Sequence, residues 1–207
     1  WLGINTAGTA ALANGENGIE LTANDNTVGG TGASDRNVIS GNNDEGVDVD
    51  PGVTGTVIIG NYIGTNAAGT AAIPNGTSPV GGTAGILLQD ASNTQVGGSD
   101  PLEMNIIAGN FGSGIRLAGP NNIVQGNLIG SNAGNTAGIA NNTGVMILGA
   151  PSLPASANAI GGVGAGEGNV IRNNSNQGIL IDAIGGTALN NTIRGNSIFS
   201  NAGIGID

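Results

Sequence analysis

Short segments in which aliphatic residues alternate with other residues recur along the chain, and each follows a glycine. They are GIEL, GVDV, GILL, GIRL, GVMI, GILI and GIGI, starting at Gly18, Gly46, Gly85, Gly114, Gly144, Gly178 and Gly203. Six steps separate the first start from the last, so the average step is about 31 residues. Alternation with a period of two is typical of a β-strand that buries one face. The pattern therefore predicts one such strand in every repeat of this length.

Two other short signatures lie between these segments. One is NTVGG at residues 26–30, with relatives at 93–98 and 158–162. The other is NVISGN at residues 37–42, with which we group the segments at 57–61, 105–110, 123–127 and 169–174. Each is rich in β-branched residues and is bounded by Gly or Asn, which indicates a strand between turns. Two or three short strands are thus expected in each repeat.

A longer repeat contains these shorter ones. The segment WLGINTAGTAALANG at 1–15 recurs as YIGTNAAGTAAIPNG at 62–76, and more loosely as LIGSNAGNTAGIANN at 128–142. A fourth copy, SIFSNAG, starts at Ser197, so long units start near residues 1, 62, 128 and 197. Each long unit holds two of the shorter repeats. A fixed period of this kind is the signature of a solenoid.

The repeats favour strands over helices. No segment keeps an apolar period of 3.6 residues for more than two turns, and glycine, at 41 of 207 residues, disfavours helix wherever it occurs. In a β-solenoid each strand pairs with the equivalent strand one coil away, so aliphatic side chains stack in rows. Asn and Gly suit the bends because both tolerate positive φ, and stacked Asn side chains can bond from coil to coil. We predict an all-β, right-handed parallel β-helix of about 6 to 7 coils, in which residues 1–207 form a single domain.

The combination of GNYIGTNAAGT, GIxL, NTVGG and NVISGN resembles the parallel β-helix repeat of large secreted and surface proteins of bacteria and archaea. The resemblance covers essentially the whole chain. It implies the fold and an extracellular or cell-surface location. It does not imply one function, since such solenoids include polysaccharide lyases, hydrolases, adhesins and structural arrays.

Charge and composition exclude several classes of partner. The four arginines are the only cationic side chains, against 14 carboxylates, and the net charge is −10. So few basic groups argue against binding to nucleic acid or to anionic membranes. No apolar run approaches the roughly 20 residues of a membrane-spanning helix, so we expect no membrane insertion. Cysteine is absent, which excludes disulfides and thiolate metal sites.

Cleavage of a polysaccharide is the strongest enzymatic alternative for such a solenoid. A lyase needs a base and a group that neutralises the substrate carboxylate. Lys and His are absent, however, and Tyr62 is the single tyrosine. A hydrolase needs two carboxylates about 5 to 10 Å apart across a cleft. No catalytic constellation is recognised, and a carbohydrate-active or carbohydrate-binding role stays open as the alternative function.

Four carboxylates are candidates for a metal site. In GIEL and GVDV the aliphatic residues should point inward, so Glu20, Asp48 and Asp50 should point outward. Equivalent positions of adjacent coils lie about 4.8 Å apart, which places Glu20 beside Asp48. Asp44 lies in the preceding turn, together with Glu45. This acidic ridge is either a solvated face or a Ca²⁺ site, since Ca²⁺ takes several carboxylate ligands.

The outward column of these strands changes character along the chain. After Glu20 and Asp48 it is expected to continue with Leu87, Arg116, Met146, Leu180 and Gly205. This sequence of residues is unusually apolar for a face in contact with solvent. Either the inserts at 67–84 and 150–157 cover the column, or it is a docking surface for another chain.

These observations lead us to expect a structural and interaction module of an extracellular or cell-surface protein, such as a spacer, fibre or adhesion segment. Both ends of the sequence fall inside the repeat, so we expect part of a longer array, or copies that stack end to end. The expected partners are other copies or other surface proteins, with polysaccharide as the alternative. No cofactor is required, and Ca²⁺ is the candidate ion.

Overall fold

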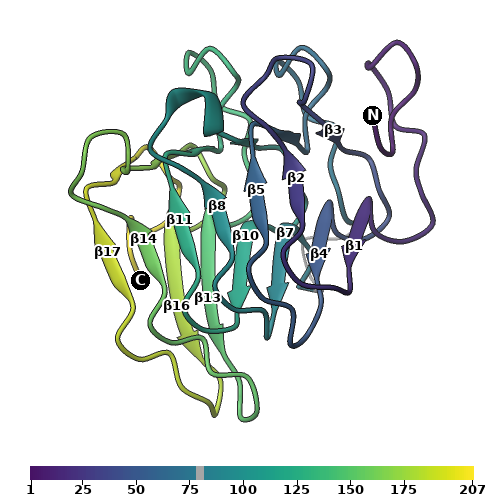
Figure 1. Cartoon of the computed structure of the whole chain (residues 1–207). Coiled ribbons are helices and arrows are strands. Elements are labelled where there is room, and N and C mark those ends of the chain that lie inside the picture. The colour runs from purple at the N-terminus through teal and green to yellow at the C-terminus, as the bar shows by residue number, and fades with distance from the viewer. Residues whose placement is uncertain (78–81) are drawn as a thin grey trace.

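A computed structural model describes residues 1–77 and 82–207, and it consists almost wholly of short parallel strands (Figure 1). The strands form three sheets of six strands each, and successive strands of the chain belong to the three sheets in turn. Three strands make one coil, and the coils stack from the purple N-terminal end to the yellow C-terminal end. The predicted all-β, parallel β-helix fold is confirmed, with about six coils in the described residues.

The three sheets are named here in the order in which the chain enters them. Sheet 1 contains β1 (Ile19–Leu21), β4 (Val47–Val49), β7 (Ala84–Gln89), β10 (Ser113–Ala118), β13 (Val145–Gly149) and β16 (Ile179–Ala183). Sheet 2 contains β2 (Thr27–Gly29), β5 (Val57–Ile59), β8 (Gln95–Gly97), β11 (Ile123–Gln125), β14 (Ala159–Gly161) and β17 (Thr192–Arg194). Sheet 3 contains β3 (Val38–Ile39), β6 (Tyr62–Ile63), β9 (Ile106–Ile107), β12 (Leu128–Ile129), β15 (Val170–Arg172) and β18 (Ser197–Phe199). A short 3-10 turn, η1 (Pro101–Glu103), lies between β8 and β9.

Inward-facing aliphatic side chains form the core in rows that run from coil to coil. In sheet 1, one row consists of Ile19, Val47, Ile86, Ile115, Val145 and Ile179, which pair in register. From Val47 to Ile179 these side chains are fully buried. Full burial of a Val, Leu or Ile side chain contributes about 1.5 to 3 kcal/mol, so stacked rows form a core without large aromatic rings.

Two details of the sequence interpretation are wrong. Residues 57–61 and 123–127 belong to sheet 2 with the NTVGG segments, and not with NVISGN in sheet 3. Several strands of both sheets are followed by Gly-Asn, directly or after one residue, which makes their sequences look alike. In the last coil, Ile179 pairs with Ile206, so Asp207 rather than Gly205 lies beside Leu180.

Asparagines, most of them buried, stack into ladders at two of the three bends. The ladder between sheets 2 and 3 consists of Asn37, Asn61, Asn105, Asn127, Asn169 and Asn196. The ladder between sheets 3 and 1 consists of Asn14, Asn42, Asn75, Asn110, Asn141, Asn174 and Asn201. Each side-chain amide donates to the side-chain oxygen of the Asn in the next coil, at 2.8 to 3.2 Å. The predicted bonding of Asn from coil to coil is confirmed.

Asn127 shows how one rung satisfies a bend. Its Nδ2 donates to the carbonyl oxygens of Val96 at 2.8 Å and Gln125 at 2.9 Å. Its Oδ1 accepts from both the backbone and the side-chain nitrogens of Asn105. The tight bend buries backbone N–H and C=O groups that have no partner within the sheets. The Asn127 side chain gives these groups their hydrogen bonds.

The third bend, between sheets 1 and 2, has a weaker ladder. Asn122, Asn158 and Asn191 continue it in the later coils, where each Oδ1 accepts a backbone N–H from the coil before. Earlier coils have Thr56 and Thr94 instead, and both hydroxyls are buried without a hydrogen-bond partner. The ladder is therefore interrupted in the N-terminal half.

Replacing Asn127 by Ala should destabilise the fold by about 3 kcal/mol, because several buried backbone and side-chain groups lose their partners together. The free energy of unfolding, measured by urea denaturation, tests this expectation. Asn43→Ala is the matched control, since Asn43 is exposed and has no side-chain hydrogen bond in the described structure. An equal, small loss for both variants would contradict the role assigned to the ladder.

Three loops stack in a row beside the bend between sheets 3 and 1. They comprise residues 5–10, 66–71 and 132–137, and each is closed by an antiparallel bridge. In the second loop the Asn66 side-chain oxygen accepts from the backbone N–H groups of Thr70 and Ala71. The loops touch directly, because the N–H groups of residues 67 and 133 donate to the carbonyls of residues 8 and 69, each at 2.9 Å. The repeated insert of the long units thus forms one continuous loop row.

Arg172 closes this loop row. Its Nη1 donates to the backbone oxygen and to the Oδ1 of Asn135, both at 3.2 Å. Asn135 has the same position in its loop as Gly8 and Gly69. The carbonyls of Gly8 and Gly69 accept an N–H from the next loop, whereas the carbonyl of Asn135 accepts from the guanidinium in place of a fourth loop. The unit that starts at Ser197 has no such loop, and the Arg172 guanidinium lies 4.9 Å from the centre of the Phe199 ring.

Replacing Arg172 by Ala should destabilise the chain by about 1 kcal/mol, through loss of its hydrogen bonds and its contact with Phe199. Amide hydrogen exchange should become faster in residues 132–137, while the first loop at 5–10 keeps its protection. Arg194→Ala, which removes an exposed arginine from β17, serves as the control. Unchanged exchange in the third loop would show that Arg172 does not hold it.

Candidate functional site

The outward face of sheet 1 contains the predicted site residues. Glu20 pairs with Asp48 in register, as predicted from the sequence. Asp48 in turn pairs with Leu87, and the column continues through Arg116, Met146 and Leu180. The face therefore has an acidic end, a middle around Leu87 and Arg116, and a stretch at Met146 and Leu180, called here the neutral end, beyond which Asp207 follows. The three parts differ in chemistry.

Asp48 is a half-buried carboxylate of the acidic end that accepts a side-chain hydrogen bond. Its Oδ2 accepts from the Asn17 side chain at 3.3 Å, and the Asn17 side-chain oxygen accepts the backbone N–H of Glu45 at 3.0 Å. The other oxygen, Oδ1, is buried without a hydrogen-bond partner. Glu45 itself is 6% exposed, although it lies in a turn.

Burial changes the acidity of two of these groups. It raises the pKa of Glu45 to about 8, and a hydrogen bond with Asp44 and the charge of Asp44 act in the same direction. Burial also raises the pKa of Asp48 to about 6, helped by the negative charges of Asp50 and Glu20 and opposed by the hydrogen bond from Asn17. Near neutral pH Glu45 therefore keeps its proton for the most part, whereas Asp48 is mostly ionised.

The four predicted metal ligands do not converge on one point. Glu20 and Asp44 are exposed, whereas Asp48 and Asp50 are half-buried. Within residues 1–77 and 82–207, no group of three or more His, Cys, Asp or Glu side chains is arranged to hold a metal ion. The Glu20 and Asp48 carboxylates lie side by side, and a calcium site at Glu20, Asp44, Asp48 and Asp50 stays a prediction.

The middle of the face is largely covered. Leu87 is 8% exposed, although it points outward from β7. The Arg116 side chain extends to the end of the insert at 67–84, where its Nη1 donates to the carbonyl oxygen of Gly82 at 2.5 Å. This agrees with the expectation that an insert shields part of the apolar column.

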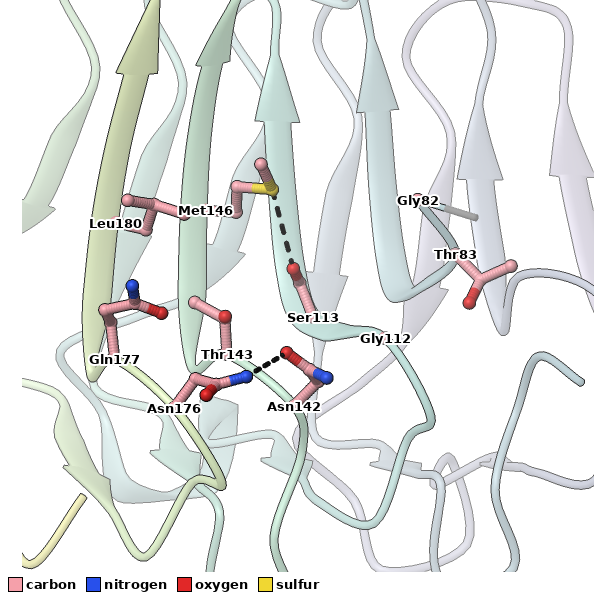
Figure 2. A pocket seen from close by; sticks show the side chains of 10 residues that line it. All are labelled: Gly82, Thr83, Gly112, Ser113, Asn142, Thr143, Met146, Asn176, Gln177 and Leu180. Carbon is pink, nitrogen blue, oxygen red and sulfur yellow. Dashed lines mark hydrogen bonds between the residues drawn. The ribbon is translucent and has the colours of Figure 1, made fainter. Parts of the chain in front are cut away.

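A groove of about 400 Å³ lies at the neutral end (Figure 2). Met146 and Leu180 of the outward column line it, together with residues from the turns that precede β7, β10, β13 and β16. These residues are Gly82, Thr83, Gly112, Ser113, Asn142, Thr143, Asn176 and Gln177, of which Ser113 is the first residue of β10. In the last three of these coils the lining residues are equivalent, at two and one residues before the glycine of the GI segment, whereas Gly82 and Thr83 lie three and two residues before Gly85.

The groove is polar along one wall and apolar along the other. The Asn176 Nδ2 donates to the Asn142 Oδ1 at 2.8 Å, and the Ser113 hydroxyl donates to the Met146 sulfur at 3.8 Å. In the described structure no protein group bonds to the Asn142 Nδ2, the Asn176 Oδ1 or the Thr143 hydroxyl. One donor, one acceptor and one hydroxyl are thus available to a ligand, with no charged side chain lining the groove.

Sequence analysis missed this groove, although a signal for it exists. The positions before the GI glycine are Glu16 and Asn17 in the first coil, but Asn142 and Thr143, then Asn176 and Gln177, in later coils. This change from carboxylates to amides is visible in the sequence. Only the pairing of the coils shows that these residues lie in one line beside Met146 and Leu180.

Comparison with protein-family models, with curated proteins and with solved structures gives no match to this chain. In the described part of the chain, no helix is long and apolar enough to cross a lipid bilayer. The candidate site is therefore interpreted from its own geometry.

Replacing Glu45 by Gln, or Asp48 by Asn, should stabilise the fold near pH 8 and leave it nearly unchanged near pH 4. Both folded pKa values lie above the ordinary values of 4.5 and 3.8, so the folded chain binds more protons than the unfolded chain between about pH 4 and pH 8. The free energy of unfolding therefore falls as pH rises through this window. We expect gains of about 2 kcal/mol for buried Glu45 and, after solvent screening, about 1 kcal/mol for Asp48.

Urea denaturation of each variant at both pH values measures these gains. Asp182→Asn is the control, because Asp182 pairs with Leu148 at the opposite end of sheet 1. We expect the free energy of unfolding of the unsubstituted chain to fall between about pH 4 and pH 8. A value that stays constant or rises would contradict the proton binding assigned to Glu45 and Asp48.

Proposed function

We propose that the chain is a structural and interaction module of an extracellular or cell-surface protein, acting as a spacer, fibre or adhesion segment. The observation that supports this most is the continuity of the coils. All three sheets keep their parallel register through the described coils, and the two full Asn ladders follow them without a break. A rigid rod of constant cross-section is the expected mechanical product.

The composition of the chain supports the same proposal. With no Lys and no His, the side chains lack two of the residue types that often act in acid–base catalysis, although 14 carboxylates are present. The absence of cysteine and the high content of Gly and Asn agree with the resemblance to secreted and surface repeat proteins. An extracellular location is part of this proposal.

Association through the ends of the coil stack is also part of the proposal. The terminal strands β1, β2, β17 and β18 each have a paired neighbour on one side only in the described structure, whereas β3 and β16 also bridge to Leu2 and Ile206 on their outer sides. A further coil, from the same polypeptide or from another copy, would pair its backbone with these strands and extend the rows and ladders. The proposed partners are thus other copies or other surface proteins.

Analytical sedimentation and negative-stain electron microscopy of the 207-residue chain test this self-association over a series of concentrations. We expect rods whose length grows with concentration. The same samples with Ca²⁺ and with EDTA test the acidic ridge, because loss of the longer rods in EDTA is expected if Ca²⁺ bridges Glu20 and Asp48. Particles of one length under all conditions would count against self-association.

The alternative is a carbohydrate-active or carbohydrate-binding solenoid, and the groove at the neutral end is the observation that bears on it. No carboxylate side chain lines this groove, so it lacks the paired acids that glycoside hydrolysis requires. Binding without cleavage is the form of this alternative that the groove supports.

A further inference from the structure

We propose that the groove beside β13 and β16 binds an uncharged, hydroxyl-rich chain, such as a neutral oligosaccharide, that lies parallel to the coil stack. This inference rests on the proposed interaction role and assigns it a ligand class and a place. Three features of the groove lead to it. They are its free hydrogen-bonding groups, its apolar wall and the spacing of its equivalent residues.

The free groups match a pair of neighbouring hydroxyls. A hydroxyl both donates and accepts, so it can accept from the Asn142 Nδ2 while its neighbour donates to the Asn176 Oδ1. The hydrogen bond between these two amides fixes their orientation before a ligand arrives (Figure 2). Thr143, which is 5% exposed, offers a third group close to the strand. Such preorganised groups lose little side-chain entropy on binding.

The apolar wall suits the carbon-bound hydrogens of a sugar ring. Met146 and Leu180 are half-buried, pair in register across β13 and β16, and both line the groove. A ligand that is polar on one edge and apolar on its faces can therefore contact both walls. Met adapts its shape to an irregular surface, which compensates in part for the absence of an aromatic platform.

The spacing favours a sugar chain over an extended peptide. Equivalent groove residues recur once per coil, at the separation of about 4.8 Å between neighbouring strands. One pyranose unit has a similar length, so two successive rings would meet the amides of Asn142 and Asn176, which lie in neighbouring coils. An extended peptide repeats its side chains on one face only every 6.6 Å or so, and its backbone would find no free strand edge along this line.

Charge favours a neutral ligand over an acidic one. Asp48 lies on one side of the groove, and on the other side the Asp207 carboxylate accepts a hydrogen bond from Gln177 at 3.3 Å. Arg116 pairs in register with Met146 and donates from its Nη1 to the Gly82 carbonyl, but its single positive charge is outnumbered by these two carboxylates. A polyanion along the stack would approach the acidic ridge, and this repulsion is only partly screened at physiological ionic strength.

Isothermal titration calorimetry of the 207-residue chain with linear neutral hexasaccharides tests the proposal, using the hexaoses of glucose, mannose and xylose. Oligogalacturonate and an Asn- and Gln-rich peptide are the comparison ligands. We expect binding of at least one neutral hexaose, and no measurable binding of the acidic chain or the peptide. Asn142→Ala and Asn176→Ala should each weaken binding about tenfold, the effect of one lost hydrogen bond of ordinary strength.

Asn43→Ala, an exposed Asn at the corresponding bend of an acidic coil, should bind as tightly as the unsubstituted chain. Thr143→Val keeps the shape of the side chain and removes the hydroxyl, so it gives a second measure if an alanine variant folds poorly. Failure of every neutral hexaose to bind, tighter binding of the acidic chain or the peptide, or unchanged affinity in the Asn variants would each overturn the assignment. Sedimentation of the same samples reports the proposed structural role separately, because rod formation does not involve the groove.

Discussion

Asparagine side chains at the bends hold this structure together, because a stacked coil must turn three times without leaving buried backbone groups unpaired. In the ladder between sheets 2 and 3, the amides of Asn105 and Asn127 each donate both to a carbonyl of the sheet 2 strand in the preceding coil and to the Asn of the next coil. One side chain therefore provides hydrogen bonds to the backbone at its own bend and fixes the position of the Asn of the next coil along the stack. Since two ladders run through the same coils, the sheets that they join cannot slip in register independently.

The loops and the groove both depend on this fixed frame. The second and third loops of the row follow strands of sheet 3 along the chain. Each of these two loops is followed in turn by a ladder residue, Asn75 or Asn141. The groove residue Asn142 directly follows Asn141, and Asn176 lies two residues after Asn174. Rigid ladder residues thus place surface amides at constant spacing. A binding surface on such a frame needs no separate mechanism to order its side chains.

Much of the fold could be predicted from the sequence, since its repeats determine which residues pair. The alternation in GIEL and GVDV predicts that Glu20 faces outward beside Asp48, and the register confirms this pair. The error at the last coil has a physical origin, because GIGID offers two positions for the same Gly-Ile pattern and Ile206 is the one that pairs with Ile179. Local sequence cannot decide which of these two positions pairs with Ile179. The backbone hydrogen bonds between the stacked coils decide it.

The candidate site was harder to predict because its chemistry arises between coils. Four acidic residues of the first two coils predict a metal site, yet Glu20 and Asp44 are exposed, while Glu45, next to Asp44, is buried and holds a proton more tightly than an ordinary carboxyl. In the groove, residues far apart in the sequence come together instead. Ser113, Thr143 and Gln177 are about 30 residues apart and become neighbours because the coils stack.

The change of charge along one face links the two proposed roles of the molecule. Carboxylates dominate the outward face of β1 and β4, whereas Met146 and Leu180 occupy the same column on β13 and β16. The backbone is the same at both ends, so substitution at a few outward positions alters the ligand chemistry without altering the rod. Inward positions cannot vary in this way, because Val47, Ile86 and Ile115 are fully buried in one continuous row. A solenoid of this kind can therefore keep its mechanical function constant while each coil changes what its surface binds.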